Sequence, residues 1–155
     1  MSVSLKSGQC LFMGGKNAAG SRAEVLELSM TSGKVKITSI GTLPKVMAEG
    51  VAAIVNGQVL VGSGGDGEET QREFFKMTRS DPAMVEWESL GWPEGARGRM
   101  YPVAGVKGGK FYLFGGRDFA ESEEQKANRI EGLDFLKDCW ELDVSLGSWK
   151  RLREF

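Results

Sequence analysis

The chain has 155 residues, of which 22 are glycine, roughly twice the usual share. Its 20 basic and 21 acidic side chains give a net charge of −1, so it lacks the basic excess of a nucleic-acid-binding protein. There is no histidine, and Cys10 and Cys139 are the two cysteines, which excludes histidine-dependent catalysis and a zinc cluster.

We accordingly expect no metal, no cofactor and no nucleic-acid partner. No apolar stretch approaches the roughly 20 residues of a membrane span, and the first residues lack the apolar run of a signal peptide. The sequence therefore predicts a soluble protein without a membrane partner and leaves its compartment open. The length suits one domain, so the high glycine content is the feature that needs an explanation.

Glycine doublets recur along the chain with a nearly fixed period. They fall at 14–15, 64–65 and 115–116, at spacings of 50 and 51 residues. A fixed period of this length indicates a repeat architecture.

Each repeat contains four short segments with the composition of strands. The second segment is an apolar run that ends at the doublet, and turn residues separate the first from the second. The turn Asn56-Gly57 is the strongest of these signals, because both positions need a positive φ. In chain order the segments are 3–6, 10–13, 25–28 and 37–40; 51–55, 59–61, 74–77 and 87–90; and 102–106, 111–114, 139–143 and 149–152.

Four strands per repeat describe the blade of a β-propeller. We predict an all-β fold with three four-stranded blades in a single domain, residues 1–155. Blade 1 covers about 1–45, blade 2 about 46–96 and blade 3 about 97–155. The third repeat carries an insertion at 121–138, which we predict to be a solvated loop; the alternative is a lid over a pocket or a partner contact.

The glycine doublets and the segments Trp87-Glu-Ser-Leu90 and Trp149-Lys-Arg-Leu152 resemble kelch repeats. The order of the segments is similar to the cyclically permuted branch of the N-acetylneuraminate mutarotases, or epimerases, a kelch family. The interruption Val61-Gly-Ser-Gly64 carries this resemblance most specifically. The resemblance implies a six-bladed propeller that interconverts the anomers of a sialic acid, a carbohydrate-metabolism isomerase.

Four arginines are the candidate contacts of a sialic acid ligand: Arg22, Arg97, Arg99 and Arg117. They follow a doublet or a fourth strand, where propellers place the loops of their binding funnel, and a guanidinium matches a carboxylate in a bidentate manner. The alternative for Arg97 and Arg99 is a structural hydrogen bond between blades. We expect Asp118 to pair with its neighbour Arg117.

The resemblance implies a catalytic glutamate in a Gly-Glu-x5-Arg arrangement. The nearest match keeps Gly15 and Arg22 but has Lys16 in the glutamate position. The catalytic residue therefore stays unknown, and with it whether the chain is an enzyme. A non-catalytic kelch module that binds a protein is the alternative function.

Three blades would form half of a six-bladed ring and leave apolar blade faces uncovered at both ends of the arc. We therefore expect a second copy, another polypeptide or a missing half to complete the propeller; the alternative is that the chain is a fragment that is poorly soluble by itself.

Overall fold

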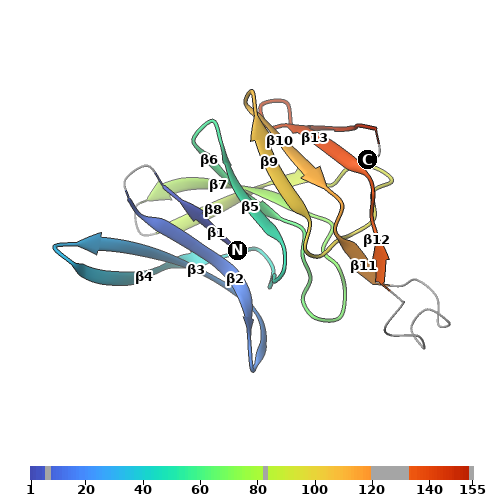
Figure 1. The fold of residues 1–155 in the computed structure, drawn as a ribbon. Coiled ribbons are helices and arrows are strands. Elements are labelled where there is room, and N and C mark those ends of the chain that lie inside the picture. The colour runs from blue at the N-terminus through green and yellow to red at the C-terminus, as the bar shows by residue number, and fades with distance from the viewer. Residues whose placement is uncertain (6–7, 82–83, 120–132, 154–155) are drawn as a thin grey trace.

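The computed structural model describes residues 1–5, 8–81, 84–119 and 133–153. These residues form three four-stranded antiparallel sheets and one two-stranded ribbon (Figure 1). The described part contains no helix long and apolar enough to cross a membrane.

The strands of the first two sheets follow one another in sequence order. The first sheet contains β1 (Ser2–Ser4), β2 (Cys10–Asn17), β3 (Gly20–Thr31) and β4 (Lys34–Thr42). The second contains β5 (Val51–Val55), β6 (Gln58–Gly62), β7 (Phe74–Asp81) and β8 (Met84–Gly91). The turn between β5 and β6 has φ values of 51° at Asn56 and 82° at Gly57, as the sequence predicts for this hairpin.

The third sheet contains β9 (Val103–Lys107), β10 (Lys110–Phe114), β13 (Cys139–Asp143) and β14 (Ser148–Arg151). Between its second and third strands lies an additional ribbon of β11 (Arg117–Phe119) and β12 (Leu133–Phe135). The expected insertion at 121–138 therefore includes a paired strand, while its residues 121–132 lie outside the described ones. The sequence analysis missed this ribbon because both strands are only three residues long.

The core lies between the sheets, in two layers. On β6, Val59 and Val61 pack against Leu11 and Met13 of the first sheet. Leu60 of the same strand belongs to the opposite layer, which joins the second and third sheets. Successive side chains of a strand point to opposite faces, so the middle sheet is covered on both sides.

An aromatic cluster fills the layer between the second and third sheets. Phe74 has no exposed surface, and its ring centroid lies 5.8 Å from that of Trp92, 5.1 Å from that of Phe111 and 5.3 Å from that of Trp149. Tilted and offset contacts of this kind stabilise beyond the burial of area.

We expect Phe74→Ala to lower the free energy of unfolding by about 3–5 kcal/mol, because it opens a cavity where three rings meet. Urea unfolding followed by tryptophan fluorescence measures the change. Met84→Ala, at a side chain that is 61% exposed, serves as the control and should cost under about 0.5 kcal/mol. A loss below about 1 kcal/mol for Phe74→Ala would contradict this packing.

Candidate functional site

The antiparallel strands place the glycine doublets and all four candidate arginines at the same end of the sheets. We call this end the loop end; it comprises the segments 15–22, 43–50, 63–73, 92–102 and 115–118, on the lower side of the view in Figure 1. Apart from the turn between β2 and β3, the hairpin turns lie at the opposite end. Segments of all three sheets therefore lie at the loop end.

Equivalent hydrogen bonds join neighbouring sheets at the loop end. Gly15 N–H donates to the carbonyl of Met47 at 2.8 Å, and Gly64 N–H donates to that of Arg99 at 2.7 Å. A Cβ at Gly14 would lie 2.2 Å from the carbonyl oxygen of Met47, closer than atoms can approach. The doublets thus supply close contact between sheets, in addition to their turn geometry.

Each of these hydrogen-bonded contacts between neighbouring sheets is a joint. Arg99 lies inside the second joint, between the second and third sheets, and not at the surface. Its side chain has no exposed surface and donates to both carboxylate oxygens of Asp138, at 2.7 and 2.9 Å, and to the carbonyl of Gly115 at 3.0 Å. Trp140 Nε1 donates to the same carboxylate at 2.6 Å. Arg99 thereby holds Asp138 in place, at the point where the long connection of the third sheet ends and β13 begins.

Burial by itself would raise the pKa of Asp138, but the hydrogen bonds from Arg99 and Trp140 outweigh it and lower that pKa. The carboxylate form is therefore favoured in the folded protein.

Arg97 and the buried Asp118 connect the second and third sheets close to this ion pair. Arg97 Nε donates to Asp118 at 3.2 Å, and the hydroxyl of Thr70 donates to the other carboxylate oxygen at 2.7 Å. The expected pairing of Asp118 with Arg117 is wrong. The two residues are successive on β11, so their side chains point to opposite faces.

Arg22 lies apart from this group, on β3 in the first sheet. Its guanidinium pairs with Glu24 on the same strand at 2.8 Å, and the two side chains are 42% and 50% exposed. Of the four candidates, Arg97, Arg99 and Arg117 therefore lie in the same region, and Arg22 does not join them in any described contact.

Arg117 belongs to a cluster with Tyr101 and Glu49. The guanidinium carbon of Arg117 lies 4.4 Å from the centre of the Tyr101 ring, and no described residue accepts a hydrogen bond from its buried Nε. The backbone N–H of Tyr101 donates to the carbonyl of Glu49 at 2.7 Å. A hydrogen bond with the Glu49 side chain is the main reason why the pKa of the Tyr101 phenol is raised; burial adds to the shift, and Arg117 opposes it.

Glu49 and Tyr101 share an unusual backbone conformation. Their φ values are 61° and 51°, in the left-handed region that residues with a side chain rarely adopt. Both stand two residues before the innermost strand of their sheet, next to Gly50 and Pro102. Strained conformations of this kind concentrate at binding and active sites.

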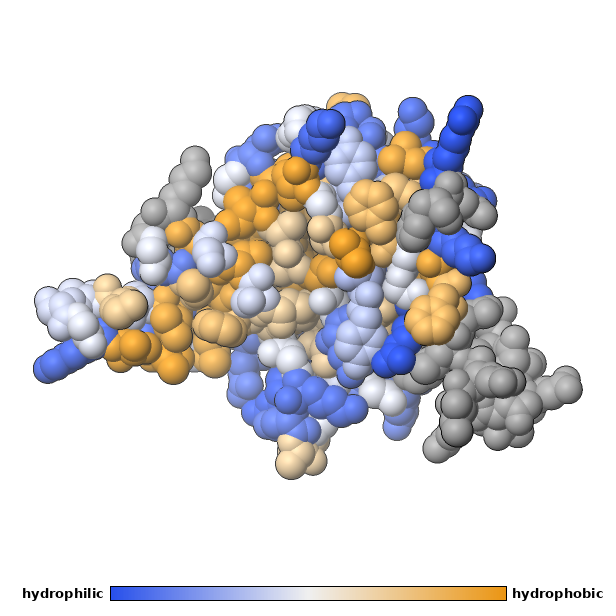
Figure 2. Space-filling model, in the orientation of Figure 1, coloured by the Kyte–Doolittle hydropathy of each residue, from blue (hydrophilic) through white to orange (hydrophobic). Residues whose placement is uncertain are grey.

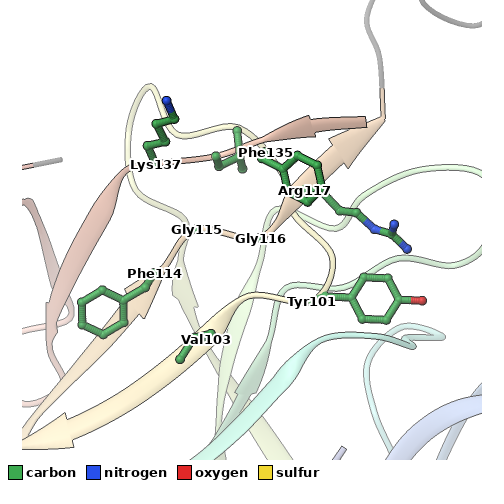
Figure 3. Close-up of a pocket in the computed structure, with 9 residues that line it drawn as sticks. Tyr101, Val103, Phe114, Gly115, Gly116, Arg117, Phe135 and Lys137 are labelled. Carbon is green, nitrogen blue, oxygen red and sulfur yellow. The ribbon is translucent and has the colours of Figure 1, made fainter. Parts of the chain in front are cut away.

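A pocket of about 560 Å³ opens beside this cluster on the third sheet. Figure 3 shows Val103 and Phe114 on one side of the doublet Gly115-Gly116, with the side chains of Tyr101 and Arg117 extending on the other. Phe135, Leu136 and Lys137 complete the lining. The pocket combines apolar walls with two cations, so it suits an anion with an apolar or ring-shaped body.

The sequence analysis missed Glu49 and Tyr101 as candidate site residues. They are 52 residues apart, close to the repeat period, and each precedes an inner strand. Aligning the repeats at this position, in addition to the doublets, would have singled them out. Among the described residues, no group of three acidic, cysteine or histidine side chains could hold a metal ion.

The chain resembles curated proteins over much of its length. Over 111 residues, 71% of the chain, it is 32% identical to the N-acetylneuraminate epimerase of Pasteurella multocida (strain Pm70). It is 29% identical over the same length to that of Haemophilus influenzae (strain PittEE). The chain is therefore similar to part of two proteins named N-acetylneuraminate epimerase. The matched segment spans 25% and 26% of those two proteins, so the chain covers about a quarter of their length; no family model matches it.

Solved structures show the fold. A fungal alcohol oxidase of the AA5 family, solved with copper, superposes with a TM-score of 0.71 at 19% identity, over 99% of this chain and 31% of the oxidase. The structure of YjhT gives a TM-score of 0.70 at 19% identity, over 98% of this chain and 50% of YjhT. The predicted all-β propeller fold with three four-stranded blades is confirmed.

We expect Arg99→Met to lower the free energy of unfolding at pH 7 by about 3–5 kcal/mol, because it leaves a half-buried carboxylate without its cation. Because the folded-state pKa of Asp138 is lowered, the pair stabilises fully above the ordinary carboxyl pKa of about 3.9 and loses this contribution as the pH falls through the folded pKa. The difference between wild type and variant should therefore shrink at low pH.

Urea unfolding at pH 7 and at about pH 3 measures this dependence. The double variant Arg99→Met with Asp138→Asn is the matched control, since it removes the charge that is left unpaired. A loss that is independent of pH, or no recovery in the double variant, would show that the ion pair does not hold the joint.

Proposed function

We propose that the pocket at the loop end of the third blade binds an acidic sugar of the N-acetylneuraminate class, and that the completed propeller interconverts its anomers. The relationship to proteins named N-acetylneuraminate epimerase supports the class of ligand. The cluster of Glu49, Tyr101 and Arg117 is the observation that carries the proposal, because it combines a cation with two groups able to exchange protons.

Arg117 provides the charge for a sugar carboxylate. Its guanidinium is held over the Tyr101 ring at 4.4 Å, and its Nε has no acceptor among the described residues. A carboxylate bound at this guanidinium would accept the hydrogen bond that Nε lacks. Hydrogen bonds between charged groups are stronger than those between neutral groups. Lys137, which also lines the pocket, adds a second positive charge.

Anomer interconversion requires one proton to leave the anomeric hydroxyl and one to reach the ring oxygen. In the proposed reaction the Glu49 carboxylate accepts the hydroxyl proton while the bond between the anomeric carbon and the ring oxygen breaks. The Tyr101 hydroxyl gives its proton to the ring oxygen. Reversal of these transfers on the other face of the open-chain carbonyl closes the ring, with no net change in protons or electrons.

The raised pKa of Tyr101 keeps its hydroxyl in the protonated form. A phenol whose pKa lies above its ordinary value of about 10 stays protonated at neutral pH. Its hydrogen bond with Glu49 links the two groups, so a proton can pass between them after each ring opening.

The exchange of N-acetylneuraminate anomers, followed by one-dimensional proton NMR from freshly dissolved crystals, tests the proposal. We expect the chain to accelerate the exchange over buffer once the propeller is complete. Tyr101→Phe and Glu49→Gln should each reduce the acceleration by roughly 100-fold or more. Arg22→Lys, at an exposed ion pair outside the cluster, serves as the control and should leave it unchanged.

Arg117→Lys should weaken binding of the sugar about tenfold while preserving the charge, because an ammonium lacks the planar donor pair of a guanidinium. Ligand-observed NMR titration measures this change. No acceleration by any form of the chain would overturn the catalytic part of the proposal. Absence of binding as well would overturn the whole and favour a non-catalytic module that binds a protein.

A further inference from the structure

Two blade faces lack a neighbour among the described residues. The middle blade is covered on both sides, with Val59 and Val61 against the first blade and Leu60 against the third. The first blade is covered on one face only, by Leu11 and Met13 against the second. The third blade is likewise covered on one face, so each outer blade has an open face.

The open face of the first blade, which we call face A, is strongly apolar. Strand register places the side chains of Phe12, Leu26, Leu28, Met30, Val35 and Ile37 on it. Phe12 is 45% exposed and Ile37 is 62% exposed. Monomeric proteins seldom leave such a contiguous apolar surface in water.

The open face of the third blade, face B, carries Val103, Tyr112 and Phe114 on β9 and β10. Val103 is 66% exposed, and the rings of Tyr112 and Phe114 stack at 6.3 Å between centroids. Figure 2 shows hydrophobic residues gathered over β3 and β4 at the left and over β9 and β10 at the right of one view.

The repeats show what kind of surface covers each face. Phe12 stands where Val61 stands in the second blade, and Val61 packs against the preceding blade. Tyr112 stands where Leu60 stands, and Leu60 is fully buried against the following blade. Between neighbouring blades of the chain, the surface equivalent to face B of one blade therefore packs against the surface equivalent to face A of the next blade.

We propose that faces A and B form the interface between two copies of this chain. Face A of each copy packs against face B of the other, about a two-fold axis, and the two identical joints close a six-bladed ring. The chain covers 50% of YjhT, so two copies match the length of that protein. This inference does not depend on the proposed function.

Closure would also complete the pocket. Val103 and Phe114 belong both to face B and to the pocket lining, so the first blade of the second copy would form the missing wall. Each ring would then contain two equivalent pockets, both shared between copies.

Light scattering coupled to size exclusion tests the interface on the 155-residue chain. We expect twice the mass of one chain. Phe12→Glu on face A and Tyr112→Lys on face B should each give the mass of a single chain, because a dimer of either variant carries the substitution in both of its joints. Leu146→Lys, at a turn residue that is 76% exposed, is the matched control and should stay dimeric.

Mixing the two monomeric variants keeps the test informative if either is poorly folded. In the mixture one joint pairs the introduced carboxylate on face A with the introduced ammonium on face B, and the other joint is wild type. We therefore expect the dimer mass to return. A wild-type monomer would overturn the proposal and point to blades from another polypeptide or from a longer chain. Dimers that survive both substitutions, or open assemblies of higher mass, would overturn the closed ring.

Discussion

The close approach between each glycine doublet and the segment that precedes the next inner strand is the constraint on which this structure depends. The hydrogen bonds from Gly15 to Met47 and from Gly64 to Arg99, at 2.8 and 2.7 Å, fix one sheet to the next at the loop end. A side chain at Gly14 would collide with the carbonyl of Met47, so the contact requires glycine. The glycine content of the chain therefore reflects how the blades are joined as much as how the strands turn.

The same joints create the conditions for a binding site. The chain must reverse sharply where it enters an inner strand, and at that point Glu49 and Tyr101 adopt left-handed backbone conformations. The buried pair of Arg99 and Asp138, 2.7 Å apart at its closest atoms, holds the neighbouring connection in place. Arg117 is left to stack on Tyr101, so the structural and the candidate functional arginines come from one short region but have separate roles.

The sequence predicted the number of blades and most strands, because each blade repeats the same apolar run, doublet and turn. It could not separate the roles of Arg97, Arg99 and Arg117, since burial and pairing depend on the connection that returns at Asp138. The pairing of Asp118 with Arg97 instead of Arg117 follows from strand alternation on β11, which the sequence analysis had treated as loop. Glu49 and Tyr101 escaped notice because a positive φ is not visible in residue types that seldom adopt it.

Positions that are buried between neighbouring blades of the chain are exposed on faces A and B, the open faces of the first and third blades. Small-angle X-ray scattering from the wild-type chain tests this account most directly, because the shape of the particle distinguishes ways of joining two arcs. The account predicts a compact disc with the mass of two chains, whose distance distribution fits one six-bladed propeller of the size of YjhT. An elongated particle, or a single arc with both faces in solvent, would contradict it.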